Sequence, residues 1–220
     1  MKTSLKGQKE KAAKVVLLLE ERYPAAECAL RYEGQAWKLL VMGRLSAQCT
    51  DARVNIVCET LFDRFPTPEA LAYGDISEIE EIVRPCGLFR MKAMQIKEEC
   101  RMLVEDFHGV LPEDMETLLT FPGVGRKIAN LLRGDIYGLP AIVADTHCIR
   151  ISSRLGLTGK GEKRPEVVEK TLSELVAPEK QSDFCHRLVL FGREVCSARA
   201  PACDKCPLYD LCVSKDAQKQ

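Results

Sequence analysis

The 220-residue sequence lacks several features that define other classes of protein. It has no run of 18 apolar residues, so we expect no membrane-spanning helix. Its lysine-rich start precedes an apolar run, Val15 to Leu19, which is too short for a secretory signal and has no small-residue cleavage site after it. Eleven cysteines without an export signal indicate a reducing compartment, in which disulfides are rare. We therefore predict a cytoplasmic protein without disulfides.

Strand alternation, internal repeats and low-complexity segments are also absent from the sequence. Apolar residues recur instead at the spacing of buried helix faces, which predicts an all-α fold. Thr50 or Asp51 is expected to cap one helix and Thr67 the next, because their side chains accept hydrogen bonds from helix amides. Residues 138–140, Gly-Leu-Pro, mark the best domain boundary. The predicted helices outside the hairpin described below cover residues 8–22, 35–45, 51–62, 77–83, 92–107, 146–155, 165–176 and 182–193.

The chain has no excess of positive charge, because 32 Lys and Arg residues balance 32 Asp and Glu residues. A net charge of zero does not suggest a nucleic-acid-binding protein, so we ask whether positive charge is concentrated in one part of the chain. Residues 67–83 carry a net charge of −5, whereas residues 84–101 carry +3 and residues 126–170 carry +4. A local excess of three or four positive charges is enough for a surface that neutralises a few phosphates. The alternative is that many of these charges only solvate exposed helix surfaces.

Residues 121–130 are the stretch around which the chain is organised. Helix formers precede it, and Ile128, Leu131 and Leu132 follow at helical spacing, while Pro122 and two glycines between them continue neither helix. We predict a helix, a tight hairpin and a second helix whose bare N-terminal amides form an anion site that suits a phosphate. An ordinary turn between two helices is the alternative. The residues expected to bind phosphate are Gly123, Val124, Gly125 and Arg126.

Four of the eleven cysteines lie within 17 residues near the C-terminus, in the pattern C-x6-C-x2-C-x5-C. Clustered thiolates select zinc or an iron–sulfur cluster. A zinc ribbon normally uses two C-x2-C pairs on separated segments, whereas this loop has one such pair with looser spacing around it. The spacing favours a 4Fe–4S cluster over zinc. The predicted ligands are Cys196, Cys203, Cys206 and Cys212.

Three motifs together resemble one known family. The hairpin that ends in Arg126 and Lys127, the Ala-Asp-Thr-His segment at Asp145, and the four clustered cysteines are similar to endonuclease III over residues 29–213. That family consists of DNA glycosylases with AP-lyase activity, within the helix-hairpin-helix base-excision superfamily. The resemblance implies a two-lobed fold with a DNA cleft between the lobes. These are a six-helix barrel that carries the hairpin, residues 29–139, and a helical iron–sulfur lobe, residues 1–28 and 140–220.

The resemblance also implies separate roles for two catalytic residues. The carboxylate of Asp145 would stabilise the positive charge that develops on the sugar, and the neutral amine of Lys127 would attack C1′ to form a Schiff base. Burial in the cleft and the positive end of the following helix would favour the neutral amine, whereas a nearby carboxylate would oppose it. The alternatives are a phosphate contact for Lys127 and a simple helix N-cap for Asp145.

Further DNA contacts follow from the same resemblance. Gln48 corresponds to the residue that fills the space left by a flipped nucleotide, and Leu88 to the wedge inserted between bases. The bland alternatives are a polar residue at a helix end for Gln48 and a core leucine for Leu88. Arg199 and Lys205, in the cysteine loop, would reach backbone phosphates.

Three places depart from the family's usual pattern. Cys49 replaces the alanine that normally follows the glutamine, and Arg84-Pro85-Cys86 precedes the wedge. Arg133-Gly134-Asp135 is expected to interrupt the second helix of the hairpin. These departures lie near the parts that separate the strands, so they bear on the choice of lesion rather than on the core chemistry.

The sequence therefore predicts a monomeric repair enzyme that acts on double-stranded DNA containing a damaged base or an abasic site. It would remove oxidised pyrimidines and cut the strand 3′ to the lesion by β-elimination. A mismatch or adenine-type glycosylase of the same superfamily is the alternative enzyme, although the adenine enzymes lack the hairpin lysine. A non-catalytic DNA-binding module and an iron–sulfur electron carrier are the alternatives from other classes.

Overall fold

The computed structural model describes residues 4–215, and within this range it contains helices and no strands, which confirms the all-α prediction. Residues 1–3 and 216–220, at the ends of the expected iron–sulfur lobe, lie outside the described residues. The chain divides into two compact units, one formed by Cys28–Tyr137 and the other by Met1–Glu27 with Gly138–Gln220. Within residues 4–215 we find no helix with the length and hydropathy needed to cross a bilayer.

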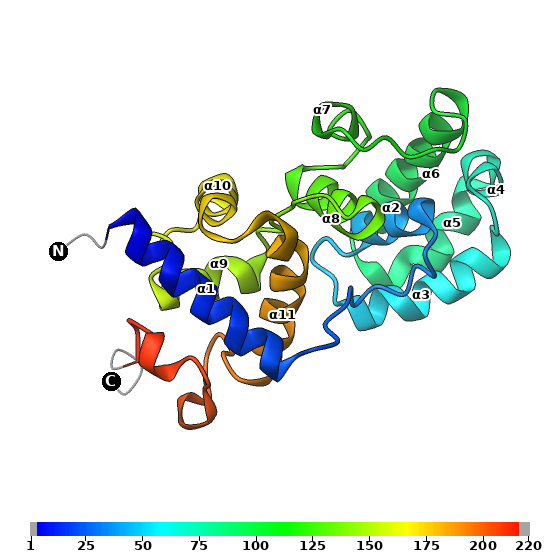
Figure 1. Ribbon diagram of the computed structural model, residues 1–220. Helices are drawn as coiled ribbons and strands as arrows, with labels where there is room; N and C mark the ends of the chain where they lie inside the picture. The colour runs from blue at the N-terminus through cyan, green and yellow to red at the C-terminus, as the bar shows by residue number, and fades with distance from the viewer. Residues whose placement is uncertain (1–3, 216–220) are drawn as a thin grey trace. The chain divides into compact units, whose positions relative to one another are not determined.

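The unit Cys28–Tyr137 consists of short helices whose first turns follow local capping chemistry. Thr50 accepts a hydrogen bond from the amide of Arg53 at 3.3 Å, and Thr67 accepts one from the amide of Ala70 at 3.1 Å, so both predicted caps are present. A 3-10 turn at Arg84–Cys86 separates two of the helices. In chain order the helices (Figure 1) are α2 (Ala36–Leu45), α3 (Asp51–Arg64), α4 (Pro68–Tyr73), α5 (Ile76–Val83), α6 (Phe89–Glu105), α7 (Met115–Leu118) and α8 (Arg126–Tyr137).

Two details of this unit differ from the prediction. Helix α6 begins at Phe89, three residues early, because Leu88 turns the chain in the left-handed conformation and the helix starts directly after it. Helix α8 runs without a break to Tyr137, so the expected interruption at residues 133–135 is wrong. Gly134 is buried in α8. One glycine costs a helix only about 1 kcal/mol, less than the packing of the apolar face stabilises it.

The core of this unit contains an acidic side chain, Glu99 of α6. It is 0% exposed, and neither carboxylate oxygen has a hydrogen-bond partner among the described residues. Burial raises the pKa of Glu99 well above its usual value, and Arg44 opposes this shift only in part. The folded protein therefore keeps the proton at pH values at which the unfolded chain releases it. The contribution of Glu99 to the free energy of unfolding is accordingly highest at low pH, and it falls as the pH rises from the unfolded pKa toward the folded one.

We expect Glu99→Gln to raise the melting temperature, and to raise it more at pH 8 than at pH 5. The amide keeps the shape of the protonated carboxyl group but has no proton to lose above the unfolded pKa of about 4.3. Calorimetric unfolding at both pH values measures the difference. Glu98→Gln is the matched control, because Glu98 is an exposed partner of Arg101. A gain that is independent of pH, or equal for both variants, would contradict the assignment to a buried acid.

The second unit joins segments from both ends of the chain. Helix α1 (Leu5–Arg22) packs beside α11 (Gln181–Glu194), as Figure 1 shows. The guanidinium Nε of Arg187 donates to the carbonyl of Tyr23 at 3.2 Å, and Lys11 donates to the carbonyl of Leu155. The other elements of this unit are α9 (Thr146–Leu155), α10 (Pro165–Leu175) and three short 3-10 helices at Pro178–Lys180, Cys203–Lys205 and Tyr209–Leu211.

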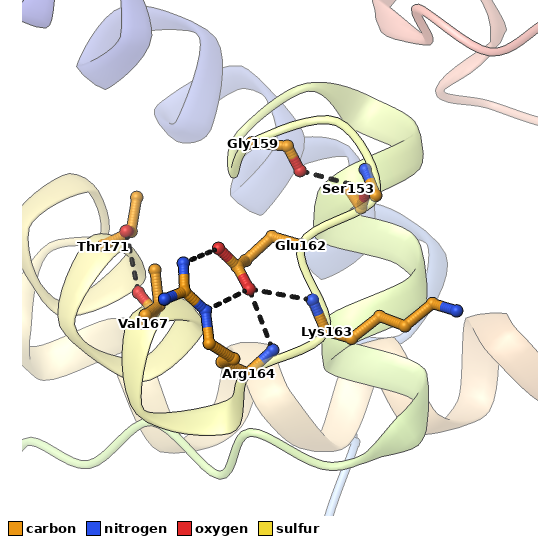
Figure 2. A network of polar contacts seen from close by, with 8 residues as sticks. Ser153, Gly159, Glu162, Lys163, Arg164, Val167 and Thr171 are labelled. Carbon is orange, nitrogen blue, oxygen red and sulfur yellow. Dashed lines mark hydrogen bonds and ion pairs between the residues drawn. The ribbon is translucent and has the colours of Figure 1, made fainter.

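One carboxylate organises the polar loop between α9 and α10 (Figure 2). Glu162 accepts hydrogen bonds from the amides of Lys163 and Arg164, both at 3.0 Å, and from the Arg164 guanidinium at 2.9 and 2.7 Å. The hydrogen bonds from Arg164 lower the pKa of Glu162 to about 2. The charge of Arg164 is thus neutralised locally, a pairing that the net charge of +4 for residues 126–170 already includes.

Candidate functional site

The hairpin lies between α7 and α8, and two apolar side chains anchor it. Phe121 is 2% exposed, and its ring stacks on that of Phe107 with the centroids 5.3 Å apart. The amide of Val124 donates to the carbonyl of Phe121 at 3.0 Å, which closes the turn. Because the side chain of Val124 is buried, only its backbone is available to a ligand.

Gly123 occupies a position in the hairpin that no other residue fits. Its φ of 76° lies in the left-handed region, and a Cβ there would come within 2.5 Å of Arg44 Nε. Arg44 is itself held in place, because its Nε donates to Gln95 Oε1 at 2.6 Å. Gly123 therefore lets the hairpin backbone lie directly on a buried arginine that links α2 to α6.

The face of the hairpin opposite its anchors is open to solvent. Gly123, Gly125, Arg126 and Lys127 are all exposed. The amide of Ala129 donates to the carbonyl of Gly125 at 3.0 Å, so the amides in the first turn of α8 have no carbonyl partner within the helix. These amides and the Arg126 guanidinium lie on the face where we predict an anion site. Lys127 is exposed at the start of α8, within its own unit.

Asp145 belongs to the other unit, where it caps α9. Its side chain accepts a hydrogen bond from the amide of Cys148 at 2.7 Å, and the residue is half-buried. Two residues on, His147 Nδ1 lies 3.1 Å from Arg150 Nη2. The cap fixes the direction of the carboxylate and at the same time starts α9, whose arginines contact the cysteine loop.

Gln48 and Leu88 occupy two neighbouring turns of the unit Cys28–Tyr137. Both are exposed, Leu88 to 56%, so Leu88 is not the core leucine of the bland alternative. Both also take left-handed backbone angles, with φ of 55° and 48°. The departures Cys49 and Cys86 lie in the same two turns as these residues. Burial raises the pKa of the Cys86 thiol to about 11, which makes it unreactive.

The four C-terminal cysteines line one pocket. All are half-buried, and Arg154 and Tyr209 complete the wall of this pocket. No group of three or more His, Cys, Asp or Glu side chains within residues 4–215 is arranged to hold a metal ion. All four thiols therefore border one hollow, as the ligands of one iron–sulfur cluster would. Arg199 and Lys205, the predicted phosphate contacts, are exposed on the same loop.

Two arginines of α9 hold the cysteine loop, and neither was identified from the sequence. Arg154 Nη1 lies 3.3 Å from Cys196 Sγ and 2.7 Å from the carbonyl of Ser197. Arg150 donates through Nη2 to the carbonyl of Cys196 at 3.0 Å. A donor on a ligand sulfur is the kind of contact that orients a metal ligand and tunes its charge. Their spacing of four residues places both on one face of α9, but it does not indicate what that face contacts.

Comparison with known families defines the class of protein. Residues 41–178 match the family described as "HhH-GPD superfamily base excision DNA repair protein", and residues 196–212 match the "Iron-sulfur binding domain of endonuclease III". The chain is thus a helix-hairpin-helix protein of base excision DNA repair. The second match confirms that an iron–sulfur cluster is its cofactor.

Individual relatives show which family within this superfamily the chain resembles. Endonuclease III of Synechocystis sp. is 44% identical over 96% of this chain and 95% of the relative, and that of Bacillus subtilis (strain 168) is 42% identical over 91% and 90%. The solved structure of a non-covalent endonuclease III–DNA complex is 37% identical, with a TM-score of 0.90 over 96% of this chain and 98% of that one. A trapped covalent endonuclease III–DNA intermediate matches with the same TM-score and identity. The chain belongs to the endonuclease III family.

Proposed function

We propose that this protein is a bifunctional DNA glycosylase and AP lyase that removes oxidised pyrimidines from double-stranded DNA. The observation that carries this proposal is the exposed lysine, Lys127, in the first turn of α8, directly after a glycine hairpin whose open face presents amides. The hairpin binds a backbone phosphate, and this contact sets the distance between the lysine and the sugar of the neighbouring nucleotide.

Base release begins when the damaged nucleotide leaves the stack and enters a pocket, since its C1′ is unreachable inside the duplex. Lys127 Nζ forms a bond to C1′ as the bond from C1′ to the base breaks, and the base departs with a proton. The carboxylate of Asp145 stabilises the positive charge on the sugar in the transition state. This charge exists only while the bond to the base breaks, so the carboxylate accelerates that step in particular.

Strand cleavage follows from the same covalent bond. The bond from C1′ to the ring oxygen O4′ breaks, O4′ takes up a proton, and the N,O-acetal at C1′ becomes an imine between the sugar and Lys127. The imine makes the C2′ proton acidic. When this proton leaves, a C2′–C3′ double bond forms, the C3′–O bond breaks and the 3′ phosphate is expelled. Hydrolysis of the imine then returns the free lysine.

The proposal includes the arrangement of the remaining parts. Residues 29–139 form the barrel lobe, with Gln48 filling the vacated space and Leu88 as the wedge. Residues 1–28 and 140–220 form the cluster lobe, in which the cluster orders the loop that carries Arg199 and Lys205 to phosphates. Four thiolates hold the cluster, those of Cys196, Cys203, Cys206 and Cys212. We further propose a monomer in the cytoplasm, a compartment reducing enough to keep the other cysteines as thiols.

Borohydride trapping on abasic DNA tests this function. The wild-type protein should give a stable product with the mass of one protein plus one oligonucleotide, because borohydride reduces the imine to an amine. Duplexes in which tetrahydrofuran replaces the abasic sugar are the control, since they have no aldehyde and should give none. On duplexes that contain thymine glycol, the protein should release the base and cut the strand. Preferred release of adenine opposite 8-oxoguanine would instead support the adenine-type alternative.

A further inference from the structure

Lys92 of α6 is a buried cation that lies outside the proposed chemistry. Its side chain is 0% exposed, and Nζ donates to three backbone carbonyls: Leu45 at 2.9 Å, Ala47 at 2.7 Å and Cys86 at 2.8 Å. Only the protonated amine has three donors, and here each of them has an acceptor. Burial lowers the pKa of Lys92 from its usual value, so these three contacts are what compensates a buried charge.

The three carbonyls come from two turns that are remote in sequence. The carbonyls of Leu45 and Ala47 belong to the end of α2 and the turn that leads into Gln48, whereas that of Cys86 lies two residues before Leu88. A single nitrogen bonded to all of them fixes the two turns against each other. Lys92 is also one helical turn beyond Leu88, and its amide donates to the Leu88 carbonyl at 3.1 Å.

Both turns hold a strained residue at their tip. Gln48 and Leu88 account for two of the four non-glycine residues with positive φ among the described residues. Such a conformation costs on the order of 1–2 kcal/mol for each residue and persists only where the surroundings impose it. The strain turns two side chains toward solvent, including a leucine that would otherwise be expected in the core.

We propose that Lys92 is a positioning residue that holds Gln48 and Leu88 as one rigid pair for strand separation. The proposal rests on the proposed function, in which these two side chains enter the duplex. If the turns were loose, the enzyme would have to order both of them while it unstacks a base pair, and that entropy would add to the barrier. With Lys92 in place, the pair is already arranged before DNA binds.

A matched pair of variants tests this role. Lys92→Met keeps the length of the side chain but removes all three donors. Lys97→Met is the control, because Lys97 lies on the same helix and also donates to a backbone carbonyl, that of Gly74, outside the two turns. Each protein is assayed with thymine glycol in a fully paired duplex and in a bubble of unpaired bases, where no strand separation is needed.

For Lys92→Met we expect kcat/KM on the paired duplex to fall on the order of 100-fold, because displacing a group by about 1 Å can have an effect of that size. On the bubble, we expect kcat/KM to fall by less than about threefold. Lys97→Met should leave both values within about threefold of wild type. Equal losses on duplex and bubble would show a merely structural role and overturn the proposal, as would an unchanged rate on the duplex. If Lys92→Met does not fold, Lys92→Arg replaces it. Its planar fork cannot direct three donors at these carbonyls, so the same difference between substrates is expected.

A second readout separates this proposal from the proposed chemistry. The fluorescence of 2-aminopurine opposite a tetrahydrofuran site rises when a protein unstacks that base, and it requires no bond cleavage. Wild type and Lys97→Met should give the rise at saturating protein, whereas Lys92→Met should not. If the wild-type protein unstacks the base and Lys92→Met does not, while wild type never releases thymine glycol, the proposed function is contradicted and the role of Lys92 is supported. A full rise with Lys92→Met would overturn it.

Discussion

A Lys127→Gln variant is expected to give no borohydride-trapped complex with abasic DNA. It should also lose base release by at least about 1,000-fold, as other covalent enzymes do without their nucleophile. Glutamine is similar in length and leaves the hairpin intact, but an amide nitrogen cannot form an imine. Trapping on a preformed abasic site and single-turnover release of thymine glycol measure the two losses. Because Lys127 is exposed, the substitution should not change the melting temperature.

Arg126→Gln is the control that separates the nucleophile from a phosphate contact. It removes the same unit of charge from the adjacent residue of the same helical turn. We expect weaker binding and a salt dependence whose slope is smaller by about 1, with full trapping once the protein saturates the DNA. If Lys127→Gln behaves like Arg126→Gln, so that trapping recovers at high protein concentration, then Lys127 is only a phosphate contact and another amine forms the imine.

Much of this fold could be predicted because its signals are local. A helix N-cap is a contact between residues two or three apart, so Thr50, Thr67 and Asp145 could be identified as caps without knowledge of the tertiary structure. The hairpin was predictable for the same reason, because Gly123 and Gly125 lie between two helical stretches and interrupt them. The cysteine pattern is also local, because all four thiols come from one loop.

Features that depend on distant segments could not be predicted in this way. Nothing in α1 specifies that its apolar face packs on α11, more than 150 residues later, because any apolar face would satisfy the same pattern. Lys92 of α6 is a second example of a contact that the local sequence does not predict. A lysine between Met91 and Ala93 has the pattern of a solvated position, and it is buried only because three carbonyls from two other turns converge on it.

The candidate site likewise combines local features that the sequence predicts with long-range contacts that it does not predict. Sequence alone indicated that Lys127 and the glycines share one turn, and the structure shows that turn resting on Arg44. It did not reveal that the tips at Gln48 and Leu88 are joined through a buried amine, or that Arg154 touches the sulfur of Cys196. These contacts support the residues that the family resemblance names. Each is made by a side chain, Lys92 or Arg154, whose neighbours in the sequence do not indicate the contact.

Asp145→Asn is expected to slow release of thymine glycol on the order of 100-fold or more, while cleavage at a preformed abasic site stays within about tenfold of wild type. The difference has a physical reason. Release of the base generates positive charge on the sugar, which a neutral amide stabilises poorly. The aldehyde of an abasic site reacts with the lysine without that charge. Separate assays on the two substrates therefore distinguish a carboxylate that acts on the sugar from one that only supports the fold.

The cap made by Asp145 provides the control for this prediction. Asparagine is as good a cap as aspartate, so Asp145→Asn should keep the bond to the Cys148 amide and leave stability nearly unchanged. Asp145→Ala removes the cap as well and should lower the free energy of unfolding by about 1 kcal/mol. If base release follows stability across these two variants, with the asparagine variant as active as wild type, the carboxylate is a helix cap and has no part in the chemistry. If both variants lose release equally while only the alanine variant loses stability, the charge itself is what the reaction uses.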